Sequence, residues 1–527
     1  MKNNAISRAA GKLAGMFRRP ARRNFESANL TRFNTPFYAQ AISTNQDLRM
    51  SLDNMRRASR EQAKNDGSYR KYLKMCERNI IGHQGIRLQM DVRGIDGADK
   101  WANDAIEEEW RKFSAFGNCT ANRRMTMRGF LKLVVRALRT DGEVFIRRIP
   151  GFDNRFRYAF QLLDPAACPT TLNFITAEGN RVIMGVELDN WNAPVAYYFY
   201  ARPPQSVLLG LEYDAVYTGD YREVDGQGFF RIPAVEVNHY FEREFVDQSR
   251  GYPYGQAALQ EMNLLRAYIK SELVASEAAS NKFGALVNPD EKRIYSGRKN
   301  ADGTSASGNE KPTMPSNPGE VMVLTGGWKF ESFDPQHPGS NFAGFVKAMN
   351  RTISNGLDVA YNNFANDLES TNFSSMRGGV LDERDAWMDA QQSLIENVLL
   401  PEFYRWLEWQ VMRDEFPFDF RDIDRISRAR FLPRRWTWVD PEKDAKSAIY
   451  KIAVGATSPQ AVAAELGTDF SDNVELTGEA LSRLGKVQEF LVGMDKLEKA
   501  LTPAGGVAVQ ELADDPDKVE EGGDAQE

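Results

Sequence analysis

The sequence predicts an α+β protein built from several structural units, and three observations support this class. Several long stretches repeat apolar residues at helical spacing. A block between about residues 143 and 241 holds short β-branched and aromatic runs separated by Gly, Pro, Asn and Asp, which is typical of strands. The length of 527 residues suggests about three or four units of roughly 100–200 residues each. A hydrophobic fraction of 42% is ordinary for a folded protein with a sizeable core.

Three helices are predicted before the strand block. Residues 47–81 have a helical pattern that Gly82 and Gly85 end, and 101–116 and 127–140 are two further amphipathic segments. The strand block then contains five runs, EVFIRRIP, FRYAFQLLDP, RVIMGVELDN, PVAYYFYA and AVEVNHYF. The residues up to about 250 are therefore expected to form one α+β body.

A long helix is predicted over 254–282. Ala258, Met262, Leu265 and Ile269 recur at i, i+4, i+7 and i+11, and small Ala and Ser residues occupy several other faces. Such a helix is about 40 Å long at 1.5 Å per residue, and its small residues let neighbouring elements approach closely.

Residues 283–340 differ in composition, with a Gly/Ser/Asn-rich stretch followed by many prolines, and indicate a small unit inserted between two helices. The second helix is expected over 341–363, where Gly344 and Gly356 are weak points that each cost up to about 1 kcal/mol relative to Ala.

A polar loop over 364–379 is expected next, and then a long helix from Val380. Val380, Trp387 and Leu394 form a seven-residue apolar repeat, and Pro401 is expected to kink the helix. The acidic residues Asp382, Glu383 and Asp385 fall in the expected first turn, where they complement the helix dipole.

The C-terminal part is predicted to be helical and then disordered. Pro441 fits the first turn of one helix, Ser458–Pro459 opens another that Gly467 closes, and 475–491 has a helical pattern. The tail ELADDPDKVEEGGDAQE has eight acidic residues and one basic residue. Before these helices, Arg434, Arg435, Trp436 and Trp438 fit either a nucleic-acid platform or ordinary alternation on a strand.

The sequence offers little sign of catalytic chemistry. A P-loop needs Gly-Lys followed by Ser or Thr, and neither Gly11–Lys12 nor Gly485–Lys486 meets this requirement. The three histidines lack HxxxH spacing and the three cysteines lack CxxC spacing, so we predict no catalytic residue, no metal and no cofactor. No run of about 18 apolar residues is present, so no membrane contact is predicted.

The charge pattern argues against a tight non-specific nucleic-acid binder. The net charge is −6, while the first 23 residues hold seven basic and no acidic residues and are expected to form a flexible basic arm. Tight binding to phosphates requires a basic balance that this chain lacks as a whole.

Six segments together carry a family resemblance. They are RRASREQAKNDGSYRKYLKMCERNIIGHQGIRLQ (56–89), DGEVFIRRI (141–149), GVELDNWNAPVAYYFY (185–200), RIPAVEVNHYFEREFVDQSRGYPYGQAAL (231–259), PGEVMVL with NFSSMRGG (318–324 and 372–379), and DPEKDAKSAIYKIAVGATSPQAVAAELGTDF (440–470). In this order they resemble the lambda-type phage portal proteins. The most specific is the fourth, with its succession Ile-Pro-Ala, His and Gln-x-Arg-Gly-x-Pro.

The resemblance implies an α+β multidomain portal fold with a wing, long stem helices, an inserted clip and a helical crown. The implied units are a flexible basic arm (1–29), the wing (30–253), a stem helix (254–282), the clip (283–340), a second stem helix (341–363), a tunnel loop (364–379), a long kinked helix with a return to the wing (380–440), the crown (441–497) and a disordered acidic tail (498–527).

The same resemblance implies a ring, usually of twelve subunits, at one capsid vertex, through which double-stranded DNA is packaged and ejected. The implied partners are the terminase large subunit, head-completion or connector proteins, and the major capsid and scaffold proteins. The protein would occupy the virion, and the host cytoplasm during assembly. A head-maturation protease or another packaging enzyme, and a scaffold or minor capsid protein without a channel, are the alternatives.

Candidate channel residues follow from the tunnel-loop interpretation. The polar loop residues expected to face DNA are Asn366, Asp367, Ser370, Asn372, Ser374 and Ser375. A loop with few cations suits a channel that must not grip DNA, because each Lys or Arg paired with a phosphate adds salt-sensitive affinity. A wing-edge loop without DNA contact is the alternative. Lys347 and Arg351 either line the stem bore or pair with an acidic residue of a neighbouring subunit, and the sequence does not separate these two alternatives.

Overall fold

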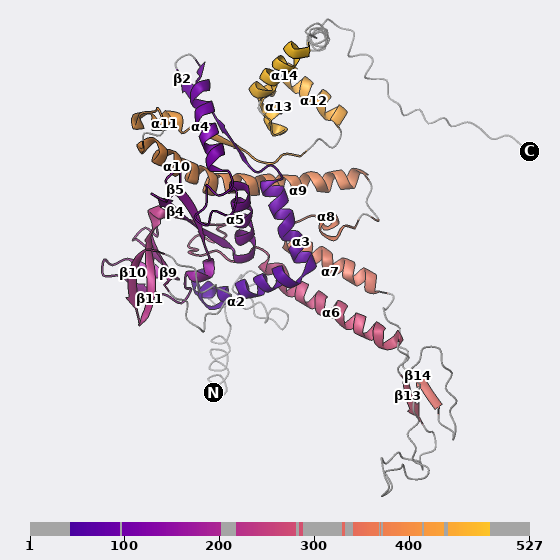
Figure 1. Ribbon diagram of the computed structural model, residues 1–527. Helices are drawn as coiled ribbons and strands as arrows, with labels where there is room; N and C mark the ends of the chain where they lie inside the picture. The colour runs from indigo at the N-terminus through magenta and orange to yellow at the C-terminus, as the bar shows by residue number, and fades with distance from the viewer. Residues whose placement is uncertain are drawn as a thin grey trace, which may run out of the picture.

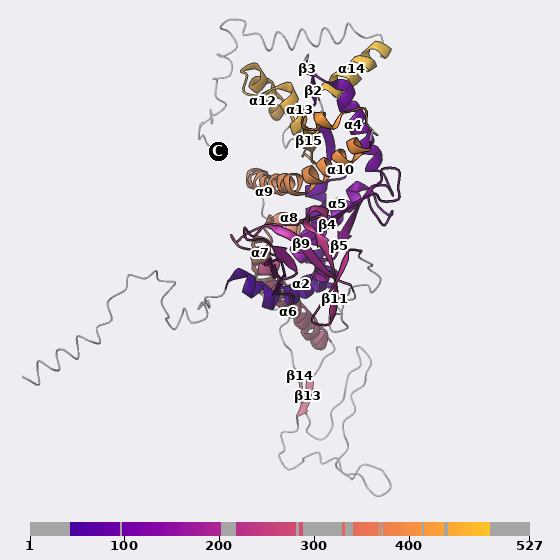
Figure 2. The ribbon, with the colours of Figure 1, turned by 90° about the vertical axis from the view of Figure 1, so that its left-hand side faces the viewer.

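The computed structural model describes residues 43–94, 97–201, 218–280, 284–287, 329–332, 341–367, 369, 373–413, 416–436, 441–468 and 470–484. A mixed α/β body carries two paired helices that project toward a small two-stranded sheet, and three helices lie at the opposite end of the molecule (Figure 1, Figure 2). The predicted α+β class is therefore confirmed. The predicted basic arm (1–29) and acidic tail (498–527) lie outside the described residues.

The N-terminal segment forms two helices where one was predicted. Helix α2 (Thr44–Asn65) and helix α3 (Gly67–Cys76) meet at Asp66, which has an extended backbone conformation (φ −105°, ψ 124°). The Asp66 carboxylate accepts a hydrogen bond from Tyr69 N and so caps α3, a role that Asp favours over a helix interior. A π-helical turn, η3 (Glu77–Ile81), follows, and Gly82 at φ +78° ends it as predicted.

The next two helices match their predictions closely. They are α4 (Lys100–Phe113) and α5 (Met127–Asp141). Thr126 caps α5 by accepting from Gly129 N, and Gly142 ends it in the left-handed conformation at φ +84°. Short β1 (Arg87–Met90) pairs with β15 (Ala429–Leu432), and β2 (Arg93–Gly94) pairs with β3 (Gly97–Ala98).

The strand block forms two antiparallel sheets. The first has the order β12-β4-β5, with β4 (Glu143–Pro150), β5 (Tyr158–Leu163) and β12 (Val237–Phe241). The second has the order β10-β11-β9-β8-β7-β6, with β6 (Phe174–Ile175), β7 (Arg181–Ile183), β8 (Val186–Leu188), β9 (Pro194–Tyr200), β10 (Asp220–Val224) and β11 (Gln227–Pro233).

The predicted run 181–190 is a hairpin of β7 and β8 rather than one strand. Met184 and Gly185 both have positive φ at the turn between them. A Cβ on Gly185 would lie 2.8 Å from Cys168 Sγ, so the turn also requires glycine for its close packing.

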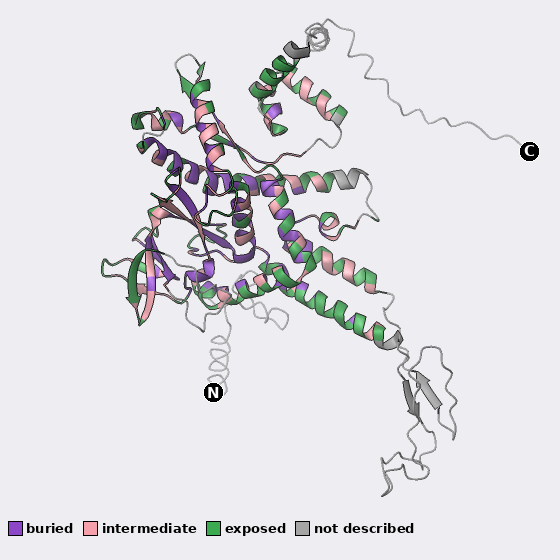
Figure 3. Ribbon diagram, viewed as in Figure 1, coloured by how far each residue is buried: buried purple, intermediate pink, exposed green. Residues whose placement is uncertain are grey.

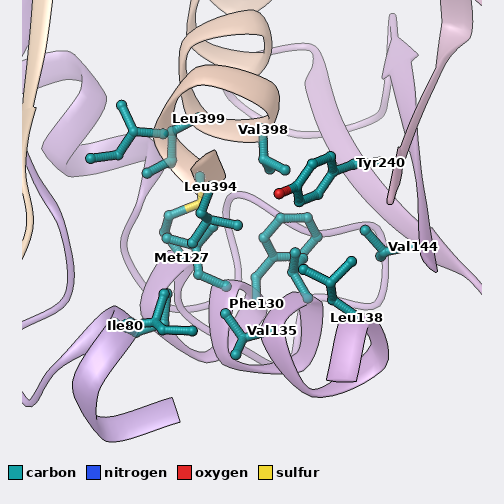
Figure 4. Close-up of a cluster of buried hydrophobic side chains, with 14 of the residues drawn as sticks. Ile80, Met127, Phe130, Val135, Leu138, Val144, Tyr240, Leu394, Val398 and Leu399 are labelled. Atoms are coloured by element: carbon teal, nitrogen blue, oxygen red, sulfur yellow. The ribbon is translucent and has the colours of Figure 1, made fainter. Parts of the chain in front are cut away.

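The largest core joins α3, α4, α5, β4 and β12 to a long helix from the second half of the chain. Figure 4 shows Ile80, Met127, Phe130 and Leu138 packed beneath Leu394, Val398 and Leu399 of that helix. Trp110, Phe113, Phe403 and Trp406 add a buried aromatic group in which neighbouring ring centroids lie 5.0–6.0 Å apart. The core therefore fixes the second half of the chain against the first.

Helices α6 (Gln256–Ser280) and α7 (Phe342–Gly356) pack antiparallel and project from the body (Figure 1). The Tyr268 ring lies 5.9 Å from Phe342 and 4.9 Å from Phe345 at the far end. At the near end, a Cβ on Gly356 would lie 3.1 Å from the Ala258 Cβ. The first predicted long helix is thus confirmed, and its small residue Ala258 lies at a close helix contact.

The second predicted helix, 341–363, is wrong beyond Gly356. Residues 357–360 form a turn in which Asp358 has φ +54°, and the short helix α8 (Tyr361–Ala365) follows. Within the inserted unit, β13 (Gly284–Val287) pairs antiparallel with β14 (Lys329–Ser332), and its other residues lie outside the described part.

The long helix predicted from Val380 begins seven residues earlier. It comprises α9 (Phe373–Leu394), the π-helical turn η7 (Ile395–Leu399) and α10 (Leu400–Met412). Pro401 cannot donate a backbone hydrogen bond and would clash with the turn before it. The π turn accommodates the proline within the helix, because Leu400 N donates to Ile395 O, five residues back, and the regular α-helical pattern is interrupted there. Figure 1 accordingly shows α10 running on from α9.

The C-terminal helices lie together at the end of the molecule opposite β13 and β14 (Figure 2). After the short helical turns η8 (Phe420–Asp422) and α11 (Ile423–Ile426) come α12 (Pro441–Ala453), α13 (Pro459–Glu465) and α14 (Phe470–Leu484). Ser458 caps α13 and Gly467 follows its end at φ +75°, as predicted. Helix α14 starts five residues before the predicted Glu475. Across the described residues, the helices are all too short or too polar to span a membrane.

Candidate DNA-channel site

A polar cluster around α8 contains four of the predicted channel and stem-bore residues, Lys347, Arg351, Asn366 and Asp367. The Lys347 ammonium on α7 lies 2.6 Å from the Asp367 carboxylate, and Tyr361 Oη donates to the same carboxylate at 2.6 Å. Hydrogen bonds from Lys347 and Tyr361 lower the pKa of Asp367 to about 2. Lys347 therefore has a partner in its own chain, and Asp367 is ionised at neutral pH.

Asn366 ends α8 in the left-handed conformation, at φ +55°. Its Oδ1 accepts from Lys71 Nζ at 2.6 Å, and the same ammonium donates to the carbonyls of Asn363 and Phe364 at 2.6 and 2.7 Å. A cation at a helix C-terminus satisfies carbonyls that lack partners within the helix. Lys71 thus ties α3 to α8. No local sequence pattern indicates this contact, because 292 or more positions separate the partners.

The remaining contacts join α8 to α7 and α9. The Arg351 guanidinium lies 5.2 Å from the Tyr361 ring centroid, within cation–π range. The Asn363 side-chain amide donates to the Glu383 carboxylate on α9. Glu383 is buried, and this burial raises its pKa. Since α9 begins at Phe373, Asp382, Glu383 and Asp385 are not in its first turn, and the helix-dipole interpretation is wrong.

The predicted loop is shorter than 364–379. Ser374 and Ser375 lie in the first turn of α9 rather than in a loop, whereas Ser370 and Asn372 lie outside the described residues. Gly378 and Gly379 belong to the predicted loop, but both are helical residues of α9. A Cβ on either glycine would meet nothing within 4 Å. A helix of 22 residues can tolerate two glycines at about 1 kcal/mol each.

Arg434, Arg435 and Trp436 follow β15, which ends at Leu432, and Trp438 lies outside the described residues. Arg434 Nη1 donates to Arg78 O at 2.8 Å and to Asn79 Oδ1 at 2.7 Å, and its guanidinium lies 5.5 Å from the Trp436 ring centroid. These contacts fasten the segment to η3, so alternation on a strand does not account for Arg434.

A second site lies deep in the body and joins three of the segments that carry the family resemblance. The fully buried Glu143 carboxylate, at the start of β4, accepts hydrogen bonds from Arg56, Arg250, His239 and the Gly251 N–H. Arg250 Nη2 lies 2.6 Å from Glu143 Oε1, and Arg250 also donates to the carbonyls of Pro165 and Cys168. This network connects α2, β4, β12 and the segment that leads into α6.

The charges of this network reinforce one another. Burial alone would raise the pKa of Glu143, but the positive charges of Arg250 and Arg56 outweigh it and hold that pKa well below its usual value. Burial lowers the pKa of His239, although Glu143 opposes the shift. Glu143 is therefore the ionised partner and His239 a neutral hydrogen-bond donor, which agrees with a structural histidine.

The segment 248–251 is held in place by contacts that depend on its residue types. The Gln248 amide oxygen accepts from the backbone N–H groups of Glu244 and Phe245, and its Nε2 donates to Arg250 O. A Cβ on Gly251 would lie 2.1 Å from Gly142 O, so the two chain segments touch backbone to backbone. Gln, Arg and Gly of the Gln-x-Arg-Gly-x-Pro succession thus each have a defined role in anchoring the start of α6.

The described residues contain no group of three or more His, Cys, Asp or Glu side chains placed to hold a metal ion. Cys76, Cys119 and Cys168 are buried free thiols, as the sequence predicts for core cysteines. His337, the third histidine, lies outside the described residues.

Comparisons of the sequence with known proteins identify the family of this chain. The family model described as phage portal protein, lambda family, matches residues 31–391. A probable portal protein of Halomonas phage phiHAP-1 is 30% identical over 469 residues, which are 88% of this chain and 87% of that protein. The chain is thus a phage portal protein, and it belongs to the lambda family of these proteins.

The comparison with solved structures matches chains from gene transfer agent (GTA) particles. A chain from the neck of an empty GTA particle computed with C6 symmetry is 14% identical, with a TM-score of 0.39 over 79% of this chain and 93% of that chain. A chain from the neck of the native GTA particle computed with C12 symmetry is 12% identical, with the same TM-score and coverage.

Proposed function

We propose that copies of this chain assemble side by side into a ring at one capsid vertex, and that double-stranded DNA passes through the central bore during packaging and ejection. In this proposal 43–253 with 380–436 form the wing, α6 and α7 the stem, 283–340 the clip and 441–497 the crown. Membership of the portal family supports the role, and the geometry of α6 supports the ring.

The outer half of α6 is the observation that carries the proposal. Beyond Leu265, most described residues of this helix are exposed (Figure 3). Glu272 is buried, and Ala275 and Ser276 are half-buried. Leu264, Ile269, Leu273 and Val274 are 57%, 41%, 69% and 57% exposed, and they point in different directions around the helix. A helix that is apolar on several faces is normally buried, yet among the described elements it is mainly α7 that covers this helix along one side, and α2 adds a smaller contact.

A neighbouring copy supplies the missing cover. Each fully buried Leu or Val side chain contributes about 1.5–3 kcal/mol, so partial burial of four such residues at each interface is enough to favour association. The same residues on every subunit make a repeated contact, which closes into a ring when the rotation between neighbours is constant.

The cluster around α8 lies beside the stem and suits a channel wall of low affinity. Lys347 is paired with Asp367, Arg351 stacks on Tyr361, and Lys71 caps α8. A phosphate would have to compete with these internal partners for each cation, so DNA passing this surface gains little salt-sensitive affinity. Asn366, Ser370, Asn372, Ser374 and Ser375 then provide weak polar contacts to the sliding duplex.

The clip and wing provide the docking surfaces in this proposal. The inserted residues 283–340 meet the terminase large subunit during packaging and the head-completion or connector proteins afterwards, and the wing meets the major capsid and scaffold proteins. The protein is then a component of the virion, assembled in the host cytoplasm, and it has no catalytic role.

Imaging of the purified assembly tests the proposal. Negative-stain end views should show a ring of about twelve copies whose hole admits a double helix. The double variant Leu273→Glu/Val274→Glu should prevent ring formation, because it places carboxylates in the interface. Val246→Glu is the matched control, since Val246 is 96% exposed on a wing loop. A wild-type protein that stays monomeric under assembly conditions, or rings without a hole, would refute the proposal.

A further inference from the structure

Two oppositely charged surfaces lie on opposite sides of α3. The first, which we call the basic groove, has a volume of about 510 Å³ and is lined by Gly67, Arg70, Lys71, Lys74, Glu77, Arg78 and Lys132. Five cations and one carboxylate give it a formal charge of +4. Arg70, Lys74 and Lys132 form no ion pair with any residue that the structure describes.

The second surface, which we call the acidic pocket, is a cavity of about 260 Å³ between α3, β12, α7 and α9. It is lined by Arg139 and three carboxylates, those of Glu242, Asp358 and Asp389, so its formal charge is −2. Asp385, one helical turn before Asp389, extends the negative surface along α9. Neither Asp385 nor Asp389 has an ionic partner in the described part of the chain.

The acidic pocket also contains a donor without an acceptor. Arg139 is only 4% exposed, and its Nε has no hydrogen-bond partner among the described residues. Its Nη1 lies 3.4 Å from Glu242 Oε2, a long contact for a buried guanidinium. A buried donor of this kind costs free energy until something supplies an acceptor. The pocket is therefore open to further polar contacts as well as to positive charge.

The two surfaces cannot neutralise each other within one molecule. Tyr72 of α3 lines the acidic pocket, whereas Arg70 and Lys74 line the basic groove. Residues two positions before and after Tyr72 point to the opposite face of a helix with 3.6 residues per turn.

We propose that the basic groove of one copy docks against the acidic pocket of the next copy, so that one charged contact is repeated around the ring. This inference rests on the proposed ring and names its polar contact. A contact between two different surfaces of identical chains is head-to-tail, which is the type of interface that closes into rings of more than two subunits.

The proposed contact steers assembly and sets its register. Opposite surface potentials speed encounter between subunits and disfavour wrong orientations, while apolar burial at α6 provides most of the affinity. Salt screens exposed charges within about 10 Å at 0.1 M ionic strength. The rate of ring formation from subunits should therefore fall as salt is raised.

A charge-swap experiment tests the pairing. The groove variant Arg70→Glu/Lys74→Glu/Lys132→Glu changes the formal charge of the groove from +4 to −2, so both of its surfaces are negative. The pocket variant Asp385→Lys/Asp389→Lys changes the formal charge of the pocket together with Asp385 from −3 to +1, so both of its surfaces are positive. Each variant alone should need at least about tenfold more protein than wild type to form rings, because like charges then face each other. An equimolar mixture should form rings again, with the two variants alternating.

Further arms of the experiment separate the possible outcomes. The chain that carries all five substitutions should form rings alone, since both of its surfaces are reversed together. Asp104→Lys/Arg124→Glu changes exposed charges on the wing and should assemble like wild type, and circular dichroism checks that each variant is folded.

Three results would overturn the contact. Rings formed normally by both single variants would do so while leaving the proposed function intact. Failure of the mixture and of the variant with all five substitutions to form rings would have the same meaning. Normal rings from the groove variant that have lost binding to a short DNA duplex would assign the groove to DNA. A wild-type chain that forms no ring would instead refute the proposed function itself.

Discussion

Replacement of Glu143 by Gln should strongly destabilise the body, because this carboxylate is the only acid that contacts both Arg56 and Arg250 in the described structure. Glu143 is fully buried, and the two arginines are 2% and 0% exposed. Glutamine keeps the shape and one acceptor oxygen but removes the negative charge. Glu143→Gln therefore leaves two buried guanidinium groups without their shared counter-ion.

The magnitude follows from the burial of the network. Removing one partner of a buried ion pair costs about 3–5 kcal/mol, because the remaining charge stays desolvated. Arg60 and Asp141 lie close to the network, and their pair at 2.6 Å, with Arg60 24% exposed, is unaffected by the substitution. We therefore expect a loss of about 3–5 kcal/mol in the free energy of unfolding, which is a large part of the stability of a typical domain.

Urea unfolding measures this loss. Unfolding is monitored by the fluorescence of the buried Trp110 and Trp406, at equal protein concentration for both chains. The urea midpoint of the variant should fall, while the slope of the transition stays unchanged. Glu236→Gln is the matched control, since Glu236 is 35% exposed and pairs with Arg147 at 3.0 Å. Its expected cost is at most about 1 kcal/mol. Equal small losses for the two variants would refute the role assigned to the buried charge.

Three further predictions follow. Gly251→Ala should unfold the body or lower its urea midpoint sharply, since its Cβ would lie 2.1 Å from Gly142 O, whereas Gly378→Ala on open helix surface should raise the midpoint slightly. The folded-state pKa values of His239 and Glu143 both lie below their usual 6.5 and 4.5, so below about pH 6.5 the unfolded chain binds more protons than the folded chain. The urea midpoint should therefore fall as pH drops below about 6.5, first through His239 and then through Glu143. A midpoint that rises on acidification would contradict this. Asp367→Asn should speed amide hydrogen exchange in α8 without changing exchange in α5, because it removes the contact to Lys347; unchanged exchange in α8 would show that the pair does not hold this helix.

Elements whose local signals agree could be predicted closely from sequence. Helix α5 has its cap at Thr126, its apolar stripe and its terminal Gly142 within one short segment, and the structure places all three there. The predicted end of the helix 341–363 was wrong because Gly356 fits both a weak point within a helix and a helix end. Only the close packing of Gly356 on Ala258, about 100 positions earlier in the chain, separates these two interpretations.

The buried network could not have been predicted in the same way. The segments that contain Glu143 and Arg250 were recognised as family signatures, but the contact between them spans 107 positions and depends on the fold. The partners of Lys347 and Asn366 could not be predicted either, because the local sequence around these two residues indicates only polar residues near a turn. Sequence patterns identified segments of the candidate channel site, and tertiary packing determined which of their side chains meet.

The two sites together indicate how α6 and α7 are held against the body. The network around Glu143 fixes residues 248–251 immediately before α6, and the cluster around α8 fixes the end of α7 to α3 and α9. The near ends of both projecting helices are thus anchored by buried or internally paired polar groups, while the outer half of α6 exposes apolar side chains. Because the anchors need no neighbour and the apolar surface does, the body of each subunit can fold before assembly. Loss of a neighbour should then raise amide exchange in the outer half of α6 and leave β4 and β12 protected.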